Sequence, residues 1–476
     1  MDKQGNLKTT KIVHGQQYAV ISSKFPKLEK TNKECLGATF NDPLGATFAQ
    51  VYLHNNFNYL IWNDQFYGEP GGETGYPMGK YNPVKKKWVN PDIPWGHSKG
   101  MLAWNEDGDG FVLQVSTPSW PASGSQSNPR KIDGNTLGCV IDDDIEVSQH
   151  FFCLKINVAD LETILKALKN ASVVTDPTNI QIANIKSPSN IVDLVKNLNL
   201  GKLPGEKNEQ VPSAPPLPLP ALTIDSLSKI SGVRVISKPA AIHAPPWQLV
   251  SAKLGGVPLR VASWWAAAEG IYSTKSNTKF NCWTGGLQKP GAVEIATSGT
   301  WAGSSIGFMG TPSPGGNHAK LGVSTDPGKH LSIFGDMNQE GTLNEMKDPK
   351  PFTSDVPTCE VHQNGRGGLF FVVEHTALFN YMTALLKGDT APLNPPKKTP
   401  PSSKKKVAAP KKKAAVQKNK TAAPKKKAAP KKKVTSPKKK TAPKKKTATL
   451  KKKAVAVKKK VATPKKKSST VKEKRN

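Results

Sequence analysis

The sequence has few cysteines and no long apolar run. Its five cysteines, Cys35, Cys139, Cys153, Cys282 and Cys359, are widely spaced and form no CxxC pair, which argues against a zinc site. This spacing favours reduced thiols in the core and leaves one or two disulfides open. No stretch of about eighteen apolar residues occurs, so we expect no membrane span. The first twenty residues also lack the apolar segment of a secretory signal.

Acidic residues are nearly absent from the end of the chain. Of the 69 lysines and arginines, 34 lie at 397–476 beside a single acid, Glu473, which leaves 35 bases and 34 acids elsewhere. The end of the chain is therefore a polycation joined to a nearly neutral body. It repeats PKKK, beginning at Pro410, Pro424, Pro430, Pro437, Pro443 and Pro464. Because lysine, proline and alanine cannot build a core, we expect a disordered tail at 391–476.

The body divides at a second proline-rich stretch. Leu203–Leu222 has the composition of a linker or exposed loop, so we expect an N-terminal half at 1–200, a linker at 201–225 and a C-terminal half at 226–390. Apolar periodicity predicts strands at Tyr59–Trp62, Gly110–Val115, Phe151–Ile156 and Leu369–Val373, and helices at Asp160–Lys169 and Thr376–Lys387. Strands and helices on both sides of the linker predict a mixed α/β fold of two similar halves.

Two His-x-Lys segments, one in each half, carry the chemistry. They are Trp95–Gly100 (WGHSKG) and Gly316–Lys320 (GNHAK). In an extended strand, side chains alternate, so the histidine and the lysine of each segment share a face. An imidazole can attack phosphorus or move a proton, while an ammonium neutralises the phosphate oxygens. The pair therefore favours phosphodiester chemistry.

The residues after each segment strengthen this interpretation. Ser116 lies nineteen residues after His97, behind an apolar strand, and Asn338 lies twenty residues after His318, behind another. A single His-x-Lys arises by chance in many proteins, but two copies with matched downstream elements indicate an internal repeat. We expect the two copies to face each other across one pocket.

These segments together resemble deoxyribonuclease II. The resemblance is carried by GHSKG at 96–100, VSTPSWP at 115–121, NHAK at 317–320, GDMN at 335–338 and Arg366-Gly367-Gly368, with weaker matches at Gly45-Ala46, Asn63-Asp64-Gln65, Thr136–Val140 and Asn281-Cys282. The matches follow the family's order through most of 40–385. The resemblance implies a phospholipase D-like body of two pseudosymmetric halves, each giving one His-x-Lys.

The resemblance also implies residue roles. His97 and His318 would be the catalytic pair, with Lys99 and Lys320 binding the phosphate. One histidine would attack phosphorus and form a phosphohistidine, and the other would protonate the leaving 5′ oxygen and then activate water. Which histidine is the nucleophile stays open. The implied reaction is cleavage of double-stranded DNA to 3′-phosphates, with no metal ion, no other cofactor and no small-molecule ligand.

Three further residues belong to the expected site. Ser116 and Asn338 would hold phosphate oxygens or orient the imidazoles. Asp336 is equally consistent with orienting a histidine and with a polar turn or core residue. The other histidines considered have no comparable setting and are interpreted as surface or core residues: His54, His150, His330, His362 and His375.

One departure from the family bears on localisation. Secreted members carry paired cysteines just after the second His-x-Lys and just before GDMN, and Gly322 and Ile333 stand at those positions here. The loss of both partners predicts a reducing setting. We therefore expect the nucleus or another DNA-containing intracellular compartment, with the family's lysosomal or secreted setting as the alternative.

The tail resembles those of linker histones, and many lysines near a phosphate backbone bind DNA independently of its sequence. Two other functions stay open: a non-enzymatic DNA-packaging protein with a nuclease-like body, and a phospholipase D-like lipid phosphodiesterase. The Gly303–Gly307 segment matches the GxSxG of serine hydrolases, but that pattern needs a strand before it and a helix after it. We set it aside, because it lies in a Gly/Ser-rich loop.

Overall fold

The computed structural model describes 17–34, 43–52, 57–64, 66–68, 72–76, 80–82, 87–89, 96–117, 147–175, 177, 180, 182–186, 189–196, 198, 221–240, 242, 244–265, 271–276, 278, 280, 283, 286–301, 303–310, 316–339 and 364–393. Most of the expected linker at 201–225 and nearly all of the expected tail at 391–476 lie outside the described residues, as do four of the five cysteines. Cys153 is described, exposed and unpaired. Within the described ranges, no helix is long and apolar enough to span a membrane.

The helices and strands are arranged along the chain as follows. The first half contains β1 (Gln17–Val20), β2 (Glu29–Glu34), α1 (Pro43–Tyr52), β3 (Asn58–Asn63), β4 (Phe66–Gly68), β5 (Gly72–Tyr76), β6 (Lys80–Asn82), β7 (Lys87–Val89), β8 (Lys99–Trp104), β9 (Gly110–Val115), β10 (Phe151–Ile156), α2 (Val158–Asn170), β11 (Ala183–Asn184) and α3 (Ser189–Lys196). The second half contains β12 (Thr223–Ser226), β13 (Val233–Lys238), α4 (Pro246–Lys253), β14 (Leu259–Ala262), β15 (Val293–Ile295), β16 (Ser298–Trp301), β17 (Ser304–Gly307), β18 (Leu321–Ser324), β19 (Leu331–Gly335), β20 (Gly368–Glu374) and α5 (Thr376–Leu385).

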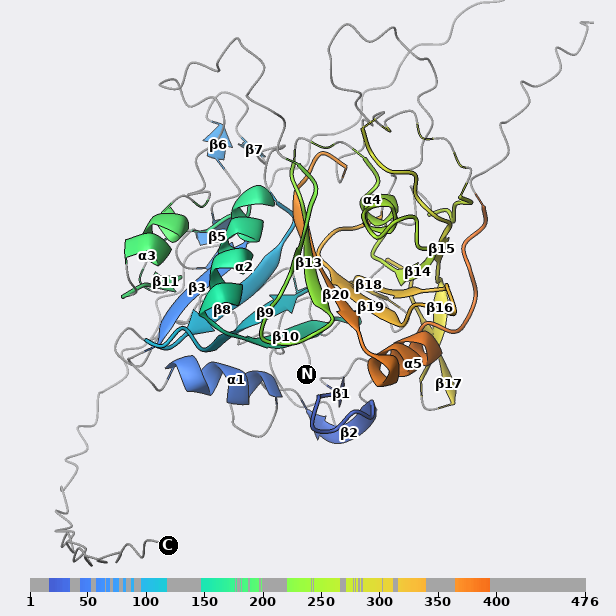
Figure 1. Ribbon diagram of the computed structural model, residues 1–476, viewed down its shortest axis with the longest axis horizontal. Helices are drawn as coiled ribbons and strands as arrows, with labels where there is room; N and C mark the ends of the chain where they lie inside the picture. Colours follow the sequence, from blue (N-terminus) through green and yellow to red (C-terminus); the bar gives the residue numbers. More distant parts are fainter. Residues whose placement is uncertain are drawn as a thin grey trace, which may run out of the picture. The chain divides into compact units, whose positions relative to one another are not determined.

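Each half holds one large sheet, and the two sheets share an arrangement of strands (Figure 1). The first sheet has the order β10-β9-β8-β3-β11, and the second has the order β12-β13-β20-β19-β18-β14-β15. The antiparallel run β10-β9-β8-β3 therefore matches the antiparallel run β20-β19-β18-β14. This repeat confirms the mixed α/β fold of two similar halves. It also places β8, which begins at Lys99, and β18, which begins directly after Lys320, at equivalent positions.

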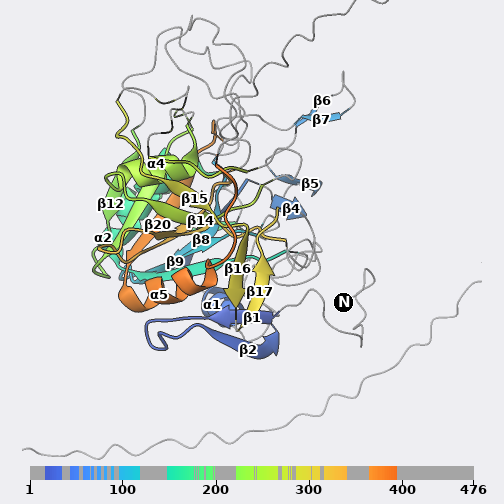
Figure 2. The ribbon, with the colours of Figure 1, turned by 90° about the vertical axis from the view of Figure 1, so that its right-hand side faces the viewer.

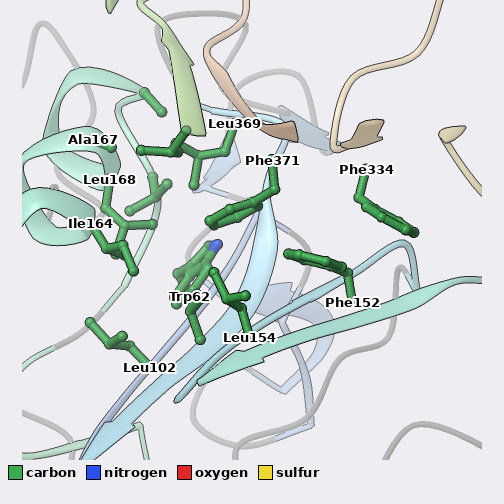
Figure 3. Packing of buried hydrophobic residues seen from close by; sticks show 14 of the residues in the cluster. Trp62, Leu102, Phe152, Leu154, Ile164, Ala167, Leu168, Phe334, Leu369 and Phe371 are labelled. Atoms are coloured by element: carbon green, nitrogen blue, oxygen red, sulfur yellow. The ribbon is translucent and has the colours of Figure 1, made fainter. Parts of the chain in front are cut away.

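The two sheets share a hydrophobic core built around α2. Ile164 and Leu168 of this helix pack in one cluster with Trp62 of β3 and Phe371 of β20 (Figure 3). The other face of each sheet has a cluster of its own, with α1 on the first sheet and α4 on the second. Figure 2 shows α4 and α5 on opposite sides of the second sheet. Because each buried side chain of this size contributes about 1.5–3 kcal/mol, the shared cluster ties the halves together.

Local sequence explains why α2 begins and ends where it does. Asn157 caps the N-terminus, since its side chain accepts a hydrogen bond from the backbone N–H of Asp160 at 3.0 Å. Asp160 lies in the first turn and Lys169 in the last, where their charges oppose the helix dipole. The helix ends at Asn170, and the carbonyl of the capping residue Ala171 lies against Gly96 of the first His-x-Lys segment.

Most of the predicted elements agree with the structure. The strands predicted at Gly110–Val115 and Phe151–Ile156 coincide with β9 and β10, and the other two lie within β3 and β20. Both predicted helices occur, although α5 ends at Leu385, two residues early. β12 begins at Thr223, so the last residues of the expected linker form a strand. Ser304–Gly307 pairs with β16 in a hairpin, which excludes the strand–turn–helix of a nucleophile elbow.

Candidate active site

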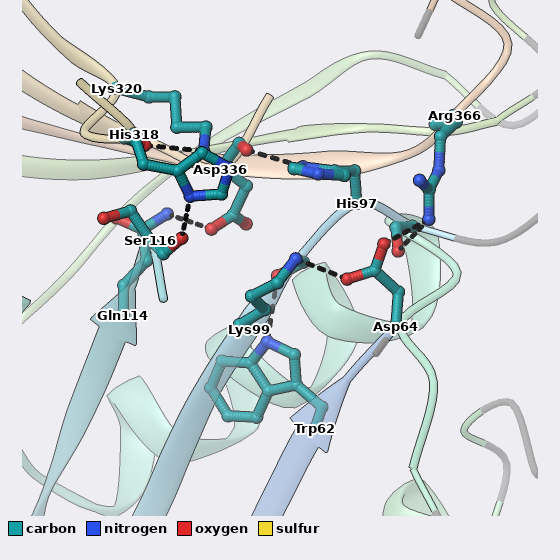
Figure 4. Close-up of polar contacts among 12 residues, drawn as sticks. Trp62, Asp64, His97, Lys99, Gln114, Ser116, His318, Lys320, Asp336 and Arg366 are labelled. Carbon is teal, nitrogen blue, oxygen red and sulfur yellow. Dashed lines mark hydrogen bonds and ion pairs between the residues drawn. The ribbon is translucent and has the colours of Figure 1, made fainter. Parts of the chain in front are cut away.

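The two His-x-Lys segments lie at the N-terminal ends of matched strands and come together in space. Lys99 is the first residue of β8, and Lys320 directly precedes β18. Figure 4 shows both pairs in one cluster of polar side chains. Lys320 contributes to lowering the pKa of His97, and Lys99 does the same for His318. Each half therefore acts electrostatically on the histidine of the other.

Each imidazole is also held by the opposite half. His97 Nδ1 lies 2.8 Å from the backbone oxygen of Asp336, and His318 Nδ1 lies 2.8 Å from the backbone oxygen of Ser116. Asp336 directly follows β19 and Ser116 directly follows β9, so the two carbonyls occupy equivalent places in the repeat. The sequence spacing matched Ser116 with Asn338 as equivalent residues of the repeat. In the structure the equivalent of Ser116 is Asp336, because each directly follows its strand.

Backbone hydrogen bonds also join each histidine to the opposite half. His97 N donates to the oxygen of Gly367 at 2.8 Å, and His318 N donates to the oxygen of Ser148 at 2.8 Å. Gly96 and Gly367 form a parallel bridge, and a Cβ on either residue would meet the carbonyl oxygen of Ala171, at 2.4 and 2.0 Å. Only glycine permits this close approach of three backbone segments. The candidate catalytic pair, His97 and His318, is thus held by both halves.

The carbonyl partners fix the form of both imidazoles. A carbonyl oxygen only accepts, so Nδ1 of His97 and of His318 must donate, which leaves the lone pair of a neutral ring on Nε2. Burial lowers the pKa of His97, and the charge of Lys99 lowers it further. Burial and the charge of Lys320 lower the pKa of His318 in the same way. Both rings therefore favour the neutral form that a nucleophile or base requires.

The two lysines have different partners. Lys99 Nζ forms a buried ion pair with Asp64 Oδ1, and Arg366 Nη2 pairs with Asp64 Oδ2. Lys320 Nζ donates to the backbone oxygen of His318 at 2.6 Å. Burial lowers the pKa of Lys320 well below its ordinary value, and the charge of Lys99 lowers it further. Two lysines beside two imidazoles provide a place for an anion, and a bound anion would favour the charged form of Lys320.

Asp336 joins the site through its carboxyl group as well as its carbonyl. Oδ1 accepts from Gln114 Nε2 at 2.9 Å, and Oδ2 accepts from the backbone N–H of Leu369 at 3.0 Å. Burial raises the pKa of Asp336 to about 7. The structure therefore brings Asp336 into contact with His97 through the backbone, whereas its carboxyl group contacts the strands behind the histidine.

Ser116 and Asn338 differ in their surroundings. Ser116 Oγ donates to Gln149 Oε1 at 2.6 Å and accepts from His150 N at 2.9 Å. Its hydroxyl group thus braces the segment before β10, and its carbonyl orients His318. Asn338 is buried, and its Oδ1 has no partner within the described part of the chain.

Three residues at the site were missed by the sequence analysis. His150 was interpreted as a surface or core residue; it is buried, and its Nδ1 accepts from the backbone N–H of Lys320 at 3.3 Å. Burial and the charge of Lys320 lower its pKa to about 3. Asp64 and Arg366 lay within segments that match the family, but nothing in their spacing indicated a shared ion pair. Among the described residues, no group of three His, Cys, Asp or Glu could hold a metal ion.

The two halves and their paired histidines suit the hydrolysis of a phosphodiester. The family model for deoxyribonuclease II matches residues 1–346, which is more than half of the chain, so the chain belongs to the deoxyribonuclease II family and is a nuclease. No curated protein matches it. Among solved structures, a mutant of yeast tyrosyl-DNA phosphodiesterase 1 is similar at 9% identity and a TM-score of 0.30, over 70% of this chain and 86% of that one.

Proposed function

We propose that this nuclease is an endonuclease that cuts double-stranded DNA without regard to sequence, needs no metal ion, works through a phosphohistidine and leaves 3′-phosphate ends. The observation that carries the proposal is the exchanged orientation of His97 and His318. Each ring has its Nε2 lone pair available and lies beside the side chains of Lys99 and Lys320. Transfer of the phosphoryl group to one imidazole, with the other imidazole moving the proton, requires such an arrangement.

The chemistry balances with the groups present. Nε2 of one histidine attacks phosphorus, and the bond from phosphorus to the 5′ oxygen breaks. The other histidine, protonated at Nε2, gives its proton to that oxygen. The same histidine then takes a proton from water, which attacks phosphorus and breaks the bond to nitrogen. The product is a 3′-phosphate, and both rings return to their starting forms.

One histidine must be protonated at the start, although burial lowers the pKa of both. The DNA phosphate supplies the missing electrostatic support, since an anion near an imidazole raises its pKa. Lys99 and Lys320 balance the additional charge as the transition state forms. The enzyme is therefore expected to acquire its acid when it binds DNA, and lower pH favours this state.

The tail supports DNA as the substrate. The tail has 34 lysines and arginines within 397–476. These side chains would neutralise DNA phosphates without contacting particular nucleobases. Ser436-Pro437 and Thr463-Pro464 precede lysine pairs and are typical of proline-directed phosphorylation sites, which would weaken this binding. The same lysines support a nuclear location, since lysine-rich segments also act in nuclear import.

The decisive experiment is plasmid nicking in excess EDTA by the wild type, His97→Ala and His318→Ala. We expect the wild type to remain active, and each variant to lose on the order of 10³-fold or more in rate. The double variant should be little slower than either single one, because the two histidines act as a unit. Acid-labile phosphate on the wild-type protein after a rapid quench would support the phosphohistidine.

His330→Ala is the matched control, since His330 is hydrogen-bonded to Thr376 and lies outside the cluster of His97, Lys99, His318 and Lys320. It should nick at the wild-type rate. Loss of wild-type nicking in EDTA with recovery in Mg²⁺ would contradict the metal-independent mechanism. Full activity of either histidine variant, or losses that multiply in the double variant, would contradict a shared site.

A further inference from the structure

Asp64 is a fully buried carboxylate between two cations. Lys99 pairs with its Oδ1 and Arg366 with its Oδ2, and the three side chains, here called the Asp64 cluster, are at most 8% exposed (Figure 4). Burial alone would raise the pKa of Asp64, but the charges of Lys99 and Arg366 outweigh burial and hold it well below its ordinary value. Asp64 is therefore ionised throughout the working range of pH.

Arg366 reaches this cluster from the other half of the molecule. It lies just before β20, and its Nη2 also donates to the backbone oxygen of Gly96 at 3.4 Å. The next residue, Gly367, accepts the backbone N–H of His97. Arg366 and Gly367 together therefore bind the carbonyl and the N–H of the peptide bond between Gly96 and His97.

Lys238 holds the backbone of this segment from behind. It is the last residue of β13 and is fully buried, and its Nζ donates to the backbone oxygens of Arg366 at 2.6 Å, Asn364 at 2.9 Å and Pro239 at 3.3 Å. An ammonium has three N–H donors, so these three oxygens use all of them. Burial lowers its pKa to about 7. The catalytic scheme above does not use this group.

The second half of the site has no such cluster among the described residues. The position that matches Asp64, directly after β14, is Ser263, whose Oγ accepts from Gln339 N at 2.9 Å. Lys320 correspondingly donates to the carbonyl of its own neighbour, His318. A buried ion pair is costly to build and is weak evidence of stabilisation, so its presence at only one of two equivalent lysines needs another explanation.

We propose that Arg366 is a positioning residue for the first His-x-Lys pair, acting through Asp64 on the Lys99 ammonium, and that Lys238 holds Arg366 in place. This inference rests on the proposed function. Asp64 occupies one N–H donor of Lys99 and leaves two for phosphate oxygens. Arg366 pairs with the second oxygen of Asp64 and so shares in neutralising the carboxylate. Lys99 is therefore held in place by Asp64 while part of its positive charge stays available to the DNA phosphate.

Four variants test the inference: Arg366→Met, Arg366→Lys, Asp64→Asn and Lys238→Met. Single-turnover rates at saturating DNA, apparent KM and thermal unfolding are measured for each. Misplacement of Lys99 should lower the saturated rate of Arg366→Met about tenfold or more, with apparent KM changed less than about twofold because uniform DNA binding is retained. Arg366→Lys should recover most of the rate, since its ammonium can still pair with Asp64. Lys238→Met should act in the same direction as Arg366→Met.

The double variant Asp64→Asn/Arg366→Met separates positioning from packing. It should be no slower than Asp64→Asn, because both residues act on Lys99 through one carboxylate. Arg234→Met is the control: Arg234 lies in β13, pairs with Glu374 at 3.9 Å and is outside the site. It should keep the wild-type rate and KM.

Three results would overturn the proposal. A raised KM and a flatter salt dependence with an unchanged saturated rate would make Arg366 a direct DNA contact. Multiplicative losses in the double variant, with no recovery in Arg366→Lys, would make the cluster structural. Wild-type rates in Arg366→Met and Asp64→Asn, with His97→Ala inactive, would remove the inference but keep the proposed function. Activity of His97→Ala would instead remove the proposed function.

Discussion

Asp336 carries a carboxyl group that is kept from water where the two halves meet. It accepts hydrogen bonds from Gln114 of the first half and Leu369 of the second, and its own carbonyl holds His97. Burial raises its pKa to about 7, although the hydrogen bonds act in the opposite direction. The carboxyl group therefore changes charge near neutral pH, close to the imidazole of the proposed catalytic residue His97.

This titration predicts a pH dependence of stability. The folded protein holds a proton on Asp336 between about pH 4 and 7 that the unfolded chain releases, so the stability gained is present at low pH and lost as pH rises through about 7. Asp336→Asn is neutral at every pH. The unfolding free energy of the wild type should fall relative to this variant, by a difference on the order of 4 kcal/mol between pH 4 and 8. Urea unfolding across that range measures it.

Asp225→Asn is the control for this measurement, because Asp225 is exposed on β12. Its stability curve should run parallel to that of the wild type. A parallel curve for Asp336→Asn as well would mean that Asp336 stays ionised in the folded protein. The charge of this carboxyl group near His97 would then not change with pH.

At the same scale, the gathering of His97, Lys99, His318 and Lys320 in one cluster could be predicted because the two spacings repeat. Asp64 and Arg366 could not. They lie 302 residues apart in the chain, Asp64 directly after β3 and Arg366 just before β20. Only the pairing of the two halves makes them partners, so their contact is a property of the tertiary structure rather than of a local pattern.

At the scale of the elements, the site depends on where strands begin. β9 and β10 were predicted to the residue because their apolar periods are long and clear. β14 and β18 have only four residues each, which is too short for a period, and their register comes from pairing with distant strands. Gly322 of β18 and Ile333 of β19 are direct cross-strand partners. A disulfide would suit such a pair in the family's secreted members, whereas here a Cβ on Gly322 would come within 2.8 Å of the ring of Trp247.

The contact between Gly96 and Gly367 gives the prediction at this scale. A Cβ on Gly367 would lie 2.0 Å from the carbonyl oxygen of Ala171, so Gly367→Ala must displace the backbone that binds His97 N. We expect a loss of about 1–3 kcal/mol in stability and a fall in nicking greater than the unfolded fraction explains. Gly286→Ala adds a methyl group with nothing within 4 Å and should change neither quantity. Normal nicking by Gly367→Ala would show that His97 does not need this contact.

At the scale of the whole molecule, the repeat predicted two halves but not the exchange between them. Two matched His-x-Lys segments are equally compatible with each histidine being held by its own half. The structure instead joins His97 to Asp336 and His318 to Ser116. The exchange makes both halves necessary for either imidazole, which is why the site's partners could not be assigned from spacing within one half.

The separation of charge gives the last prediction. Deleting 397–476 removes 34 bases and one acid, and none of the proposed catalytic residues. Each lysine that neutralises a phosphate contributes about 0.9 to the salt slope of DNA binding, so affinity at moderate salt should fall steeply and its slope should flatten. The saturated single-turnover rate should change little, because uniform binding acts on apparent affinity more than on the chemical step. A full-length variant with these lysines replaced by glutamine is the matched control, and it should behave like the deletion if charge, rather than length, is responsible. An unchanged salt slope would show that the tail does not bind the DNA being cut. A collapse of the saturated rate would mean that the tail contributes to the chemical step, and the division into a catalytic body and a DNA-binding tail would be wrong.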